Sequence, residues 1–133
     1  MRRSLGCANA AAVAAFLGFV GAASPAYAIK QFYAGLQAKY VKPDSKEPND
    51  IALDIAIEQA RCTICHPGDD KHRLTRYGGL LASRISKFDK GNKKKVREAL
   101  EEVGTLRSDP YDAKSPTYNE LFRQGRLPPN PMR

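Results

Sequence analysis

A pair of cysteines with a histidine directly behind it is the most specific chemical signal in the sequence. Cys62 and Cys65 are separated by two residues, and His66 follows the second cysteine. A CxxC pair serves three chemistries, namely thiol–disulfide exchange, zinc binding and covalent attachment of haem. In an exported protein the same two thiols can also form a simple disulfide bridge. The surroundings of the motif must discriminate among these interpretations.

Those surroundings favour haem attachment. Motifs for thiol–disulfide exchange lie in a βαβ pattern, and no strand pattern precedes Cys62. A closed zinc site needs about four ligands, but the adjacent Cys65 and His66 cannot easily both reach one tetrahedral ion, and His72 is the one further candidate near the motif. CxxCH is the signature of c-type haem attachment. The sequence therefore predicts one haem c, held by thioethers at Cys62 and Cys65, with His66 as the proximal iron ligand.

Residues 1–28 have the features of a secretory signal peptide. A start with two arginines precedes an apolar run over residues 10–23, which is too short to span a bilayer as a helix. The small residues of an A-x-A cleavage site follow at 26–28. We therefore expect cleavage before Ile29 and a periplasmic or secreted protein without a transmembrane segment in the mature chain.

The mature part, residues 29–133, is long enough for one domain. Cys7 is lost with the signal peptide, so the two motif cysteines remain and a disulfide framework is not expected. The whole chain carries 22 Lys and Arg against 14 Asp and Glu, a net charge of +8. Without the two arginines of the signal peptide the mature part has 20 against 14, a net charge of +6. In an exported domain this charge favours acidic partner proteins, whereas nucleic acid is not an expected partner outside the cytoplasm.

Apolar residues recur at helical spacing, and no segment alternates with the period of a strand. The predicted helices cover residues 29–41, 50–60, 72–88, 92–103 and 116–124. Gly78 and Gly79 interrupt the third helix, where each costs about 1 kcal/mol relative to alanine, and they could instead allow close approach to a bulky group. We expect an all-α fold of four to five short helices around one covalently bound haem, which would complete the thin core of so small a domain.

With CTICH at 62–66 behind a predicted helix, and a last helix that would pack on the first, the sequence resembles the cytochrome c family. The segments YVKPDSKEP (40–48), YGGLL (77–81) and SPTYNELFRQGRLP (115–128) are similar to a group of small bacterial single-haem domains. The resemblance implies a cytochrome c-like fold and one-electron transfer between partner proteins outside the cytoplasm.

The second axial ligand of the iron is the point where the sequence departs from that family. Its small electron carriers usually place a methionine in a loop ahead of the last helix, and here no methionine lies between His66 and Met132. Met132 and His72 are the candidate distal ligands, and Tyr77 and Tyr111 are weaker alternatives. An iron left open would bind gaseous ligands, so the alternative function is a five-coordinate haem protein that binds or senses small gases.

Catalysis is not expected, because no acid–base pair for peroxide chemistry stands out near the motif. A basic run, Lys93–Lys95 followed by Arg97, has two interpretations. It is either a docking patch for an acidic redox partner or an ordinary solvated helix face.

Overall fold

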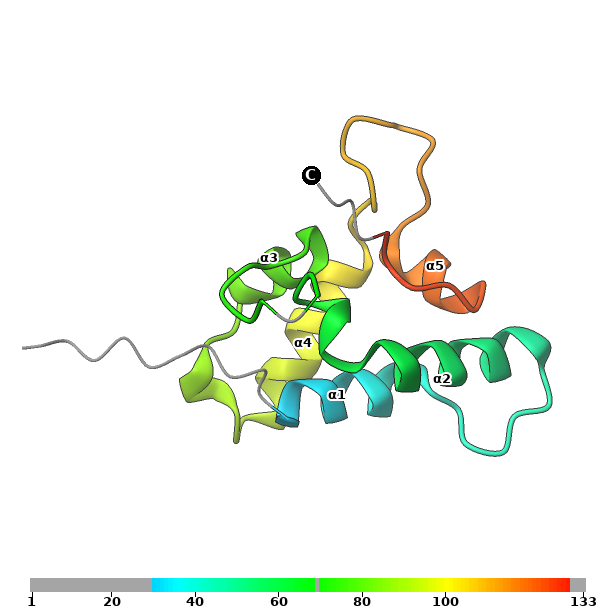
Figure 1. Ribbon diagram of the computed structural model, residues 1–133, viewed down its shortest axis with the longest axis horizontal. Coiled ribbons are helices and arrows are strands. Elements are labelled where there is room, and N and C mark those ends of the chain that lie inside the picture. The colour runs from blue at the N-terminus through cyan, green and yellow to red at the C-terminus, as the bar shows by residue number, and fades with distance from the viewer. Residues whose placement is uncertain (1–29, 69, 130–133) are drawn as a thin grey trace, which may run out of the picture.

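The computed structural model describes residues 30–68 and 70–129, which form an all-α domain (Figure 1). The helices in this part of the chain are α1 (Lys30–Tyr40), α2 (Pro48–Ala60), α3 (Arg76–Ala82), α4 (Lys93–Gly104) and α5 (Tyr118–Arg123), with short 3₁₀ helices η1 (Arg61–Ile64) and η2 (Lys87–Asp89). The described residues contain no strand, only one isolated bridge between Arg107 and Thr117. The all-α prediction is thus confirmed.

Several sequence-based expectations lie outside the described residues. These are the signal peptide over 1–28 with Cys7, the cleavage site before Ile29, and Met132. Among the residues that are described, no helix combines the length and the apolar character needed to cross a membrane.

The helix starts follow the capping residues, with some corrections to the predicted boundaries. Asn92 caps α4, since its side chain accepts a hydrogen bond from the Lys95 amide at 3.0 Å. By contrast, Asp50 lies inside the first turn of α2 and does not cap it. The third helix, predicted over 72–88, spans Arg76–Ala82. Thr75 caps its start, so residues 72–75 remain outside it, and it ends at Ala82, six residues before the predicted end, ahead of the separate 3₁₀ helix η2.

Two pairs of helices build the core. α1 lies along α4 (Figure 1), and this contact is so close that a Cβ atom on Gly35 would come within 2.8 Å of Val96 Cγ1. α5 packs on α2 and α4 more extensively than on α1, the helix on which it was expected to pack. α1 still reaches α5 at its end, where the Tyr40 and Phe122 ring centroids lie 4.1 Å apart. α5 therefore packs against α2, the helix that leads into the cysteine motif.

Tyr40 and Tyr77 belong to a cluster of aromatic side chains at this junction, and their hydroxyl groups differ in hydrogen bonding. Tyr77 is fully buried, and its hydroxyl makes no well-formed hydrogen bond with any described residue, although Tyr40 lies near it. The Tyr40 hydroxyl instead contacts Asn119 Oδ1 at 2.9 Å and the Leu100 carbonyl oxygen at 3.2 Å. A buried polar group without a partner contributes no stability and can reduce it.

We therefore expect Tyr77→Phe to leave the free energy of unfolding unchanged or slightly higher. Tyr40→Phe should lower it by about 1 kcal/mol, since it removes a hydrogen bond that is made. Urea unfolding of both variants checks this. A Tyr77→Phe variant that is the less stable of the two would show that the Tyr77 hydroxyl has a partner.

Candidate functional site

The cysteine motif lies on a tight turn at the end of α2. η1 continues from α2 and holds Cys62, and the amides of Cys65 and His66 both donate to the Cys62 carbonyl, at 3.2 and 3.0 Å. Arg61, at the junction, has a φ of 46°, a conformation that non-glycine residues adopt rarely. The chain changes direction there and brings both cysteines and His66 into one compact turn, which we call the motif turn (residues 61–66).

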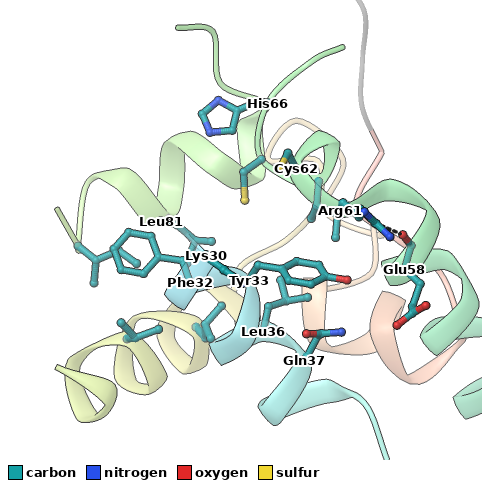
Figure 2. A pocket seen from close by; sticks show the side chains of 15 residues that line it. Lys30, Phe32, Tyr33, Leu36, Gln37, Glu58, Arg61, Cys62, His66 and Leu81 are labelled. Atoms are coloured by element: carbon teal, nitrogen blue, oxygen red, sulfur yellow. Dashed lines mark hydrogen bonds between the residues drawn. The ribbon is translucent and has the colours of Figure 1, made fainter. Parts of the chain in front are cut away.

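This turn forms one side of a cavity of about 450 Å³, within the size range of ligand pockets. Cys62, Cys65 and His66 all line it, and Figure 2 shows Cys62 and His66 at its border. The other walls are mainly apolar, with Phe32, Tyr33 and Leu36 from α1, and with Leu81, Ile85, Val96 and Leu100 from the region of α3 and α4. Polar side chains also border the cavity, namely Lys30, Gln37, Glu58 and Arg61. The structure therefore brings the three motif residues of the sequence prediction together at an apolar cavity.

The two thiols differ in their environment. Cys62 is exposed, whereas burial, together with the nearby Cys62, raises the pKa of the Cys65 thiol to about 12. Thiolates are the reactive form in disulfide exchange, so burial makes the Cys65 thiol less reactive in that chemistry. Both cysteines are free thiols in the structure, and the described residues hold no group of three or more His, Cys, Asp and Glu side chains that could bind a metal ion.

His66 is oriented by one hydrogen bond to the backbone. Only 8% of the residue is exposed, and its Nδ1 lies 2.8 Å from the carbonyl oxygen of Arg73. Because a carbonyl oxygen only accepts, this contact requires a proton on Nδ1, and in the neutral ring the lone pair is then on Nε2. A ring nitrogen bonded to a backbone carbonyl is the usual arrangement behind a histidine that binds a metal through its other nitrogen. Nε2 is thus the ring nitrogen of His66 that remains available for a further interaction.

A glycine in α3 allows the helix to approach the motif turn. A Cβ atom on Gly78 would overlap the carbonyl oxygen of Cys65 and come within 2.9 Å of the Cys65 Cα atom. Gly79, by contrast, has open space around it, with nothing within 4 Å of such an atom. Of the two glycines predicted to permit close approach, only Gly78 does so in the structure, and the neighbour that it admits is the backbone of the motif turn.

The distal-ligand candidates lie away from the cavity lining, as far as they are described. His72 is exposed, and its amide binds Asp70 Oδ1 at 2.9 Å. Tyr77 is in the core beside Tyr118, with 4.9 Å between the ring centroids. Tyr111 is 84% exposed and lies next to Arg76. None of these three side chains lines the cavity.

The contribution of α1 to the cavity is the part of the site that sequence reasoning missed. Periodicity marked Phe32, Tyr33 and Leu36 as one apolar helix face, but it contained no information on what that face covers. In the structure these side chains lie on the opposite side of the cavity from His66 (Figure 2).

The basic run on α4 lies on the outer side of that helix. Val96 and Leu100 line the cavity, whereas Lys94 and Lys95 are exposed and pair with Glu98 at 3.8 Å and with Asp89 at 2.9 Å. Local acidic partners therefore neutralise part of the run, which is typical of a solvated helix face.

No family model matches this chain, and no curated protein or solved structure is similar to it at a significant level. The functional interpretation therefore depends on the chemistry and geometry of the site.

Proposed function

We propose that the protein is a cytochrome c-like haem protein that transfers single electrons between partner proteins outside the cytoplasm. One observation carries the proposal. Both cysteines of the CxxCH motif and the His66 imidazole line a single apolar cavity, with Nδ1 of His66 engaged by a backbone carbonyl. The proposal goes beyond the all-α fold, which many unrelated functions share.

The residues present fit a covalently bound haem. Thioether formation needs two cysteines about one turn apart facing an apolar space, and Cys62 and Cys65 meet that need. The iron needs only axial ligands from the protein, because the porphyrin supplies the other four, so the lack of a larger cluster of ligating side chains in the described chain is no obstacle. When bound, the haem would supply a reversible one-electron centre.

The side chains of the cavity would support such a centre in two ways. His66 would bind the iron through Nε2, and its bond to the Arg73 carbonyl would keep the ring orientation fixed and raise the basicity of the ligand. Leu36, Leu81 and Leu100 would exclude water, which influences the reduction potential. The exposed Cys62 would bring one edge of the group close to the surface, where a partner could exchange electrons with it.

A second candidate function, the binding of small gases, is supported by the cavity wall opposite His66. Phe32 and Leu36 offer no donor atom to an iron, and the Tyr33 hydroxyl between them donates to the Ile57 carbonyl oxygen at 3.4 Å. Among the described residues, no histidine or methionine other than His66 lines the cavity. An iron with an open sixth position could bind carbon monoxide, nitric oxide or oxygen. This candidate shares the haem and the proximal ligand with the first, and differs in the distal ligand alone.

The first experiment is to export the full chain with a haem-maturation system and to measure its intact mass and its absorption spectrum. We expect the mass to include one covalently bound haem that is lost when Cys62 and Cys65 are both replaced by alanine. Reduced bands that do not respond to carbon monoxide would favour electron transfer. Bands that shift with carbon monoxide would favour gas binding, and a chain without haem would overturn both candidates.

A further inference from the structure

Thr75 connects the motif turn to the segment that orients His66. Its side-chain hydroxyl donates to the Ile64 carbonyl at 2.8 Å, and its amide donates to the Cys65 carbonyl at 2.8 Å. The same hydroxyl accepts from the Gly78 amide at 3.0 Å, which caps α3. Thr75 is 5% exposed, so water competes little for these three bonds.

Thr75 is close in the sequence to the residue that binds the His66 ring, so its bonds to the motif turn bear on the orientation of His66. Arg73, whose carbonyl accepts from the His66 ring, is two residues before Thr75 and belongs to no helix. The location of that carbonyl therefore depends on the anchoring of the chain on either side of it. On one side, the Arg73 amide makes a turn bond of 3.3 Å to the Asp70 carbonyl; on the other, Thr75 is tied to both Ile64 and Cys65.

We infer that Thr75 is a positioning residue for His66: through its bonds to the motif turn it holds the Arg73 carbonyl against Nδ1 and thereby sets which ring nitrogen faces the cavity. As regards the iron, this inference rests on the proposed function. The hydrogen bond on Nδ1 controls how strongly the imidazole donates, so Thr75 also influences the reduction potential of a haem bound there.

The test compares Thr75→Val with a matched control elsewhere in the fold. Valine keeps the shape of threonine and removes the hydroxyl, which leaves the Ile64 carbonyl and the Gly78 amide without that partner. Thr117 is the matched control, since it caps α5 by accepting from the Glu120 amide at 3.2 Å and is remote in the chain from the motif. Both changes remove a helix cap, but only the first alters the connection to His66.

The measurements are made on the exported full chain labelled with ¹⁵N-histidine. In the reduced, carbon monoxide-treated holoprotein we expect the Nδ1 proton of His66 to exchange with solvent about tenfold faster in Thr75→Val, because loss of the anchor weakens its hydrogen bond. The midpoint potential should rise, since a less basic imidazole stabilises the oxidised iron less well. Thr75→Ser should restore both values, and Thr117→Val should change neither.

Unchanged proton exchange and an unchanged potential in Thr75→Val would overturn the inference, and so would equal changes in Thr117→Val. If Thr75→Val does not fold, Thr75→Ala replaces it, because alanine also lacks the donor and its smaller side chain leaves room for water beside the Ile64 carbonyl and the Gly78 amide. If the wild-type chain carries no haem, the ¹⁵N shifts report the His66 tautomer directly. The Nδ1–H form in the wild type and its loss in Thr75→Val would then support the inference while the proposed function fails.

Discussion

Replacement of Gly78 by alanine is expected to destabilise the protein by about 3 kcal/mol and to reduce the covalently bound haem to a small fraction of the wild-type amount. The added methyl group would overlap the Cys65 carbonyl oxygen, and the obstacle is backbone, which cannot move aside as the end of a flexible side chain can. The same carbonyl accepts the Thr75 amide, so a displaced α3 also loses its anchor on the motif turn.

The neighbouring glycine gives a control of the same chemical type in the same helix. A methyl group on Gly79 meets nothing within 4 Å, so Gly79→Ala should gain up to about 1 kcal/mol from the helix propensity of alanine. Thermal unfolding checks both variants, with a decrease of more than about 10 °C in Tm expected for Gly78→Ala and none for Gly79→Ala. Similar melting temperatures for the two would show that α3 does not approach the motif turn closely.

Replacement of His66 by glycine has the second large expected effect. Cys62 and Cys65 remain in this variant. Its reduced state should nevertheless lose the absorption bands of the wild type, because the iron would lack its proximal nitrogen. Imidazole added at millimolar concentration should restore bands close to those of the wild type, since the side-chain volume removed leaves room for it beside the motif turn.

His72, the other of the two histidines in the chain, is the control. It is exposed and does not line the cavity, so His72→Ala should leave the reduced and oxidised spectra unchanged. A changed spectrum in His72→Ala would instead assign it as the distal ligand, which the sequence had allowed. A wild-type spectrum in His66→Gly without imidazole would exclude His66 as the proximal ligand.

The sequence by itself determined the helical class, and it predicted the haem-attachment chemistry that we propose for the motif. CxxCH is a local pattern, and its three donor atoms must stay close together in any fold because the residues are nearly adjacent. Helical periodicity and side-chain caps are also local, which is why α4, with Asn92 at its start, was predicted within one or two residues. The third helix was predicted too long at both ends, since the capping role of Thr75 was not recognised and the apolar spacing continues past Ala82, where the chain leaves the helix.

Only the tertiary structure decided what surrounds the motif. The packing of α1 along α4 turns the face with Phe32 and Leu36 into a wall of the cavity, and this contact joins segments about sixty residues apart. The packing of α5 on α2, and the bonds from Arg73 and Thr75 to the motif turn, likewise depend on where the chain returns in space. Periodicity shows which face of a helix is apolar, but the partner of that face is chosen by the burial and hydrogen bonding of the whole domain.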